Sequence, residues 1–120
     1  MKLTYNKHEK LKSKKGIEQL FSEGKSISAY PLRLVYVKNS ETLKVGVSVS
    51  KRNFKKAVDR IRIKRLLREA YRLNKQQLLD QNITGYSIML LYMHKDMPTF
   101  NTINALTQKA FKKFIAQLNQ

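Results

Sequence analysis

Apolar residues recur at helical spacing near both ends of the chain. One such group is Ile17, Leu20 and Phe21, and Gly24, a residue that often ends helices, follows it. This pattern predicts a short helix over 15–23. Phe21 is either a core anchor of this helix or an exposed platform for stacking. Near the other end, Pro98 suits the first turn of a last helix. The apolar stripe of that helix is Phe100, Ile103, Leu106, Ala110, Phe114 and Leu118.

Two segments alternate between apolar and other side chains, as half-buried strands do. They span 32–38 and 43–50 with a turn at 39–41 between them, which predicts a hairpin with one apolar face. The faces of the first strand are Leu32, Leu34 and Tyr36, and Arg33, Val35 and Val37. One face of the second strand is small enough to admit a ligand closely, or to lie under a helix: Gly46, Ser48 and Ser50. After a turn at 82–85, the apolar run 86–92 predicts a central strand buried on both faces.

These elements, with a further helix expected in 51–75, follow one another as helix, strand, strand, helix, strand, helix. The order predicts an α+β fold, a two-layer sandwich with helices packed on a small mixed sheet, and it leaves room for one extra short strand. We find no internal repeat or second domain, so 1–120 is expected to be one domain. Within it, 1–15 is rich in lysine without periodicity and is predicted to be a basic arm.

Composition narrows the possible functions. The chain has 25 Lys and Arg against 8 Asp and Glu, a formal net charge of +17 in 120 residues. Such self-repulsion destabilises a fold, and we expect a polyanionic partner, nucleic acid. Cys is absent, which excludes disulfides and thiolate metal sites. No apolar run reaches the roughly 18 residues that span a bilayer, so we expect a soluble cytoplasmic protein without a membrane partner. We expect no small-molecule substrate either.

The positive charge is concentrated in 51–75, where 25 residues hold 11 of the Lys and Arg and only Asp59 and Glu69 as acids. The second half of this segment predicts a helix whose core stripe is Ile63, Leu66, Leu67, Ala70, Leu73 and Asn74. The opposite arc and the residues before it carry Lys51, Arg52, Lys55, Lys56, Arg60, Arg62, Lys64, Arg65, Arg68 and Arg72. Cations at a helix start oppose the macrodipole, which favours a bound phosphate there. The alternative is a solvated basic face that serves only solubility.

The chain shows no catalytic constellation of its own. Asp59 and Glu69 would lie about 15 Å apart along a helix and cannot share a metal ion. Asp80 and Asp96 have no partner at regular spacing, and the lone His8 and His94 are expected at the surface rather than as ligands. Phosphate-binding loops and nucleophile motifs are also missing. If RNA cleavage is involved, its chemistry should come from something that this chain binds.

The segment from Lys51 to Glu69 resembles the signature of the protein subunit of bacterial ribonuclease P. That pattern is a basic run, an Ala, then Arg-Asn-Arg-x-Lys-Arg and a further Arg-Glu, and here it reads KRNFKKAVDRIRIKRLLRE. The likeness extends to the basic N-terminus, to Phe21 before the Gly24-Lys25-Ser26 run, and to the strand that ends at Ser50. It is weaker after about Leu73.

The resemblance implies a protein partner of a catalytic RNA that removes the 5′ leader of precursor tRNA, with Mg²⁺ bound mainly by the RNA. No residue of the chain would then be catalytic, and we assign none to a metal, although the sequence leaves open whether a metal binds in the cleft of the protein. The cationic residues of 51–72 would contact the catalytic RNA. A cleft between the first helix and the sheet would hold the single-stranded leader, with Phe21, Tyr36, Ser48 and Ser50. The implied fold also includes a left-handed strand-helix-strand crossover, an exception among such connections.

One position departs from the signature. Ile61 stands where the family has Asn between two arginines, about 160° from the core direction and within the basic arc. Ile61 either packs on a ribose or on the stem of an Arg side chain, or one polar contact to the RNA is lost at a cost of about 1 kcal/mol.

Two other classes of function fit a small basic α+β domain. The first is a structural RNA-binding protein of the ribosomal type, and the second is a nonspecific DNA-binding protein. The ordered Arg-x-Arg-x-Lys-Arg on one helical arc, behind a Lys-rich loop, favours the ribonucleoprotein subunit.

Overall fold

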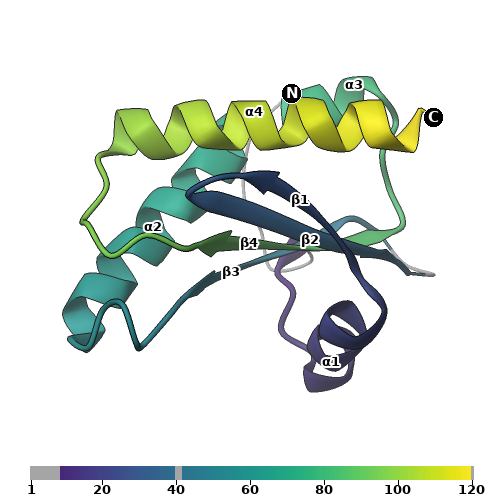
Figure 1. Cartoon of the computed structure of the whole chain (residues 1–120). Coiled ribbons are helices and arrows are strands. Elements are labelled where there is room, and N and C mark those ends of the chain that lie inside the picture. The colour runs from purple at the N-terminus through teal and green to yellow at the C-terminus, as the bar shows by residue number, and fades with distance from the viewer. Residues whose placement is uncertain (1–8, 40–41, 120) are drawn as a thin grey trace.

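A mixed four-stranded sheet separates two unequal helical layers in the computed structural model, which describes residues 9–39 and 42–119 (Figure 1). The strands are β1 (Lys25–Ala29), β2 (Leu32–Lys38), β3 (Lys44–Val49) and β4 (Tyr86–Tyr92), in the order β1-β2-β4-β3. The helices are α1 (Lys14–Glu23), α2 (Ala57–Asn74), α3 (Gln76–Asp80) and α4 (Phe100–Leu118). Helices α2 and α4 cover one face and α1 part of the other, so the predicted α+β class is confirmed.

The prediction that 32–38 and 43–50 pair as a hairpin is wrong. Both strands form, but β4 lies between them, antiparallel to β2 and parallel to β3. The hairpin partner of β2 is β1, the extra short strand, joined to it by a turn at Tyr30 and Pro31. Alternation in the sequence sets which side chains share a face, but it does not choose the neighbouring strand.

The main core lies between the sheet and helices α2 and α4. Of the predicted stripe on α2, Ile63, Leu67, Ala70 and Asn74 are buried, Leu66 is half-buried, and Leu73 is 41% exposed. Tyr71 is fully buried instead, with its ring centroid 6.3 Å from that of Phe111 on α4. Because α4 packs against α2, the end of the buried stripe turns toward position 71 and away from 73.

Helix α4 begins at Phe100, two residues after Pro98, so Pro98 precedes the helix and does not lie in its first turn. Thr99 is its N-cap, and the Thr99 hydroxyl accepts a hydrogen bond of 3.2 Å from the backbone N–H of Thr102. Its buried residues include the predicted Ile103, Ala110 and Phe114.

The predicted basic arm, 1–15, is partly integrated into the fold; its residues 1–8 lie outside the described part. Lys10 pairs with Val45 in a parallel bridge, and the N–H of Leu11 donates to the carbonyl of Val45 at 3.1 Å. Leu11 is buried beneath α1, which begins at Lys14. The end of the arm is therefore a short extension of the sheet beside β3.

Candidate nucleic-acid interface

Helix α2 and the turn before it present a row of cations to solvent. We call this row the basic surface, and its members are Lys51, Arg52, Lys55, Lys56, Arg62, Lys64, Arg65 and Arg68. All are exposed except Lys64, which is half-buried. Within 9–39 and 42–119, no acidic side chain forms an ion pair with any of them. The fold thus leaves this charge uncompensated, as a surface for phosphate groups requires.

Two predicted members of the row have partners within the protein. The guanidinium of Arg60 donates to the carbonyls of Phe54 and Lys55, at 2.8 and 3.0 Å, and so braces the turn before α2. Arg72 forms an ion pair with Glu69, in which Arg72 Nε lies 3.1 Å from Glu69 Oε2. The hydrogen bond from Arg72 lowers the pKa of Glu69 below its ordinary value, and the same bond raises the pKa of Arg72. Arg72 therefore adds less uncompensated charge than the exposed members do.

The cationic turn at 51–56 is held in one conformation by its neighbours. The N–H of Arg52 donates to the hydroxyl of Ser50 at 3.1 Å, and the N–H of Phe54 donates to the carbonyl of Ser50 at the same distance. Phe54 is buried against Tyr92, a core anchor that the sequence analysis missed. Lys56 is the N-cap of α2 and makes no side-chain capping bond. The lysines around this helix start consequently project from a rigid base.

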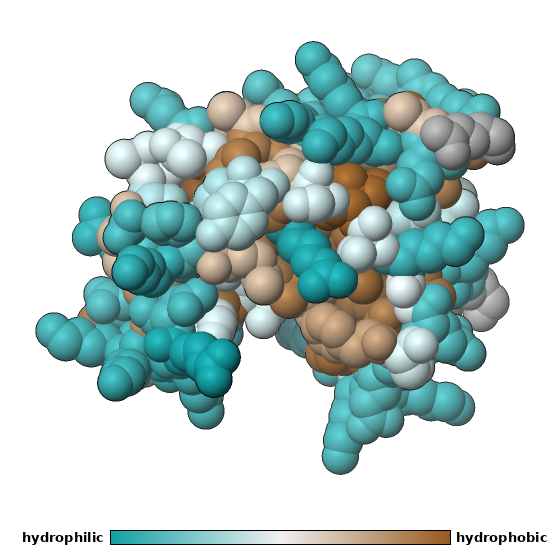
Figure 2. Space-filling view, in the orientation of Figure 1, coloured by the Kyte–Doolittle hydropathy of each residue, from teal (hydrophilic) through white to brown (hydrophobic). Residues whose placement is uncertain are grey.

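A second surface lies on the opposite face of the sheet. Helix α1 packs on β2 and β4 through Leu20 and Ile17, which meet Val35 and Met89. Gly24 permits the close approach, since an added Cβ would lie 2.1 Å from the carbonyl oxygen of Leu20 and 2.9 Å from Val35. Beyond α1, strand register aligns a row of residues on this face, which we call the sheet groove: Ser28, Arg33, Leu91 and Ser48. Figure 2 shows the lower side of the molecule indented between the part that holds α1 and the part that holds the start of α2.

Phe21 is not a core residue. It lies on α1 with 55% of its surface exposed, whereas Leu20 is fully buried. On a helical wheel it is about 40° from Ile17, at the border between the packed face and solvent. Of the two roles that its sequence position allowed, the structure leaves the exposed ring available for stacking.

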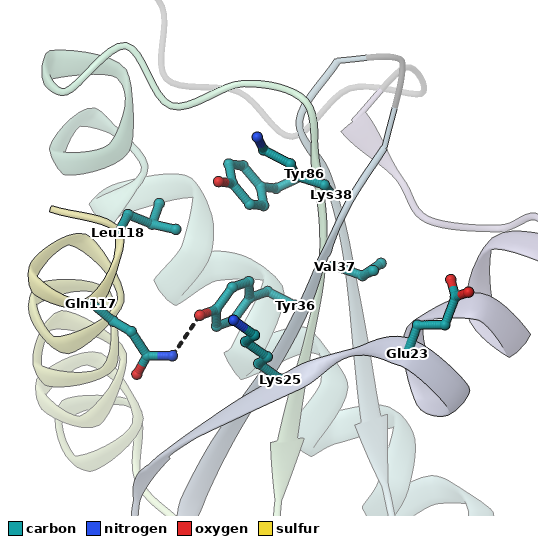
Figure 3. Close-up of a pocket in the computed structure, with 8 residues that line it drawn as sticks. All are labelled: Glu23, Lys25, Tyr36, Val37, Lys38, Tyr86, Gln117 and Leu118. Atoms are coloured by element: carbon teal, nitrogen blue, oxygen red, sulfur yellow. Dashed lines mark hydrogen bonds between the residues drawn. The ribbon is translucent and has the colours of Figure 1, made fainter. Parts of the chain in front are cut away.

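The prediction that Tyr36 shares a cleft with Phe21 is wrong. Tyr36 points to the α4 face, where it is 6% exposed and its ring centroid is 4.8 Å from that of Phe114. Figure 3 shows its hydroxyl accepting a hydrogen bond from Gln117 in a cavity of about 580 Å³, whose lining also includes Glu23 at the end of α1. The β2 residues that face α1 are Val35 and Val37. A shift of one residue along a strand changes the face, and this is the source of the error.

The two serines predicted to line the leader cleft, Ser48 and Ser50, differ in exposure. Ser48 is half-buried in the sheet groove, and Ser50 is exposed at its end, where its hydroxyl accepts the bond from Arg52. Gly46, on the same face, lies under Met89 and Leu11, so only part of this small-residue face is open.

Neither a metal centre nor a membrane span is found in the described part of the chain. There, no three His, Asp or Glu side chains gather in a way that could hold a metal ion, and no helix is long and apolar enough to cross a bilayer. The carboxylate of Asp96 lies 3.3 Å from His94, and Asp80 accepts from Gln76 at 2.7 Å. The side chains of Asp80, His94 and Asp96 thus contact residues close to them in the sequence.

The sequence matches the family model for ribonuclease P over residues 5–115. It is 39% identical over 112 residues to a ribonuclease P protein component of Porphyromonas gingivalis, a match that covers 88% of this chain and 82% of the relative. A ribonuclease P protein component of Chlorobium phaeobacteroides is 46% identical over 79 residues, covering 60% of this chain and 54% of the relative.

Solved structures show the same fold. The ribonuclease P protein of Staphylococcus aureus superposes with a TM-score of 0.73 at 24% identity, covering 90% of this chain and 96% of the other. That of Thermotoga maritima gives the same score and identity over 88% of this chain and 96% of the other.

Proposed function

This chain belongs to the ribonuclease P protein family, and from that premise we propose that the basic surface of α2 binds the catalytic RNA of the enzyme. The family membership makes the chain a subunit of an endoribonuclease that processes tRNA. The observation that carries the proposal is the row of exposed cations that no described carboxylate neutralises. Each contact with a phosphate releases condensed counterions, which makes such a surface a strong, sequence-independent RNA ligand.

The division of labour follows from the side chains available. Among the residues that the structure describes, no three His, Asp or Glu side chains gather as ligands for a metal ion, and we propose that the RNA holds the Mg²⁺. The protein's part is to bind and orient the RNAs. A polycation beside the RNA also lowers the repulsion between catalytic RNA and precursor, which reduces the Mg²⁺ that the pair requires.

We further propose that the sheet groove and Phe21 bind the 5′ leader of precursor tRNA. Ser28 and Ser48 supply hydroxyl groups, Arg33 supplies a cation, and Leu91 supplies an apolar floor. Stacking on an exposed ring such as Phe21 tolerates any base, as a leader of variable sequence demands.

Reconstitution tests the proposed function. The protein, the catalytic RNA and a precursor tRNA are combined at low Mg²⁺, and release of the leader is followed with and without protein. We expect faster cleavage with both components and none with the protein alone. Cleavage by the purified protein without RNA, or no acceleration of the RNA reaction at any Mg²⁺ concentration, contradicts the proposal.

A further inference from the structure

Three loops converge at the end of the sheet farthest from α1. They are the β1–β2 turn at Tyr30 and Pro31, the β4–α4 loop that begins at Met93, and the basic turn at 51–53. The N–H of Met93 donates to the carbonyl of Pro31 at 2.8 Å, and the amide of Asn53 donates to the carbonyl of Met93 at 3.2 Å. These bonds join the loops into one fixed surface beside the basic turn.

Tyr30 is unusually exposed on this surface. It is 70% exposed, whereas Tyr36, Tyr71 and Tyr92 are all buried. The two methionines of the adjoining loop, Met93 and Met97, are also 41% and 39% exposed. Tyr30 and Met93 line the same cavity, and neighbouring exposed apolar side chains on a highly charged protein indicate a contact surface.

The ring of His94 supports Tyr30 from one side. The ring centroids are 6.3 Å apart with an interplanar angle of 70°, an edge contact that leaves a face of the tyrosine ring open. His94 is itself held, because its Nδ1 accepts the backbone N–H of Asp96 at 3.1 Å. The hydroxyl of Tyr92 donates to the carbonyl of Asp96 at 2.8 Å and fixes the same loop. Tyr30 is thus an exposed ring on a preorganised base.

The surface around Tyr30 is continuous with the sheet groove. A cavity of about 310 Å³ lies beside Tyr30 and is lined by Ser26, Ser28, Tyr30, Leu32, Arg33 and Met93. Ser28 and Arg33 are also members of the groove. The guanidinium of Arg33 donates to the hydroxyl of Ser26 at 3.1 Å, which holds its charge over the cavity. A strand that lies in the groove can therefore continue to Tyr30 without leaving the surface.

The charged residues around Tyr30 indicate which kind of molecule binds there. Lys51, Arg52 and Lys95 are exposed on the joined loops, and Asp96 is the acid among them. A ring beside cations matches an unpaired nucleotide, which offers a base to stack and a phosphate to neutralise. An apolar protein partner would have to desolvate those cations without compensation.

We propose that Tyr30, supported by His94, is a stacking platform for an unpaired base of the 5′ leader, beyond the part of the leader that the sheet groove holds. This inference rests on the proposed function. It adds a second stacking position to Phe21, at the opposite end of the groove. The proposal includes a direction, in which the leader enters the groove at the Phe21 end, and the contact with Tyr30 then depends on leader length. Short leaders end before Tyr30, and longer leaders reach it.

A leader-length series tests the inference. The reconstituted enzyme with wild-type, Tyr30→Ala or Tyr30→Phe protein is titrated with precursors whose leaders increase in steps up to about 16 nucleotides, the upper end of the site sizes known for single-strand-binding OB-folds. Beyond a threshold length we expect Tyr30→Ala to weaken binding about five- to tenfold, with Tyr30→Phe close to wild type because the ring is kept. Below that length the three proteins should bind equally.

The controls separate this inference from the function on which it rests. Lys95→Gln removes a nearby charge and should flatten the salt dependence slightly, whereas Tyr30→Ala should leave the salt dependence unchanged. Equal binding by Tyr30→Ala and wild type at every length, or an equal loss at every length, overturns the platform. Either result can occur while the enzyme still responds to the protein, so the proposed function would stand.

Discussion

The basic surface and the sheet groove are both proposed RNA contacts, but the chain builds them in different ways. The basic surface comes from one helix and the turn before it, so all of its long cationic side chains lie within the continuous segment 51–68. The groove crosses β1, β2 and β3, which follow one another in the sequence, and β4, which comes only after α2 and α3, and Arg33 is the one cation among its four residues. The first suits a strong and salt-sensitive grip on phosphates, and the second suits a weaker contact that depends on shape and stacking.

Removing charge from the basic surface should have the largest effect. With Arg65→Ala and Arg68→Ala together, affinity for the catalytic RNA should fall at least tenfold at moderate salt. If both contact phosphates, the slope of log affinity against log salt should also decrease by about 1.4–1.8. The measurement is a binding titration over a range of salt concentrations.

The matched control for this pair is Lys109→Ala with Lys112→Ala, which removes the same charge from the exposed side of α4. A similar loss in both double variants would mean that net charge, and not the basic surface, decides affinity.

Removing the ring from the α1 end of the groove should have a smaller and more selective effect. Phe21→Ala should weaken precursor tRNA binding by about 1–3 kcal/mol and mature tRNA binding much less, because only the precursor carries a leader. Tyr36→Phe, which alters only the α4 face, should change neither. Equal losses for precursor and mature tRNA after Phe21→Ala would indicate a role of Phe21 in the fold.

Ile61 provides a finer test of the basic surface. It is 55% exposed among the cations of α2, in the position where the family signature has Asn. Ile61→Asn should restore one polar contact and strengthen catalytic RNA binding by about 1 kcal/mol. An unchanged affinity would show that the aliphatic side chain is equally accommodated.

The smallest expected effect concerns the ion pair within α2. Glu69→Gln removes an acid and its ion pair with Arg72, so affinity for the catalytic RNA should rise by no more than about fivefold. Arg72 lowers the pKa of Glu69, and the carboxylate is therefore ionised at neutral pH. The difference between variant and wild type should vanish as pH falls through that lowered pKa, because protonation then removes the same charge. A difference that persists in acid would point to another cause.

The sequence-based predictions were more accurate for the basic surface, which one segment builds, than for the sheet groove, which several strands build. Periodicity within α2 identified the buried Ile63 and Leu67 and the exposed Arg65 and Arg68, because one helix fixes both sides of its own surface. It failed at Leu73, where the crossing of α4 decides burial. Local pattern is sufficient where a site is made by one element.

Features that depend on packing between distant segments were not predictable in this way. Alternation placed Tyr36 and Val35 on opposite faces of β2, but nothing in the sequence showed which face α1 would cover. The insertion of β4 between β2 and β3 has the same origin. Tyr30 lies in a turn whose exposure depends on where the loop around His94 returns, and no local signal marks it.

Cleavage of RNA from tethered probes tests the assignment of the two surfaces most directly. The chain has no Cys, so Lys64→Cys, Ser48→Cys and Lys109→Cys each give a single attachment point for a hydroxyl-radical source. In the reconstituted complex with precursor tRNA, the probe at 64 should cut the catalytic RNA, the probe at 48 should cut the leader, and the probe at 109 should cut neither strongly. Strong cuts in the catalytic RNA from position 109 with none from position 64 would contradict the account.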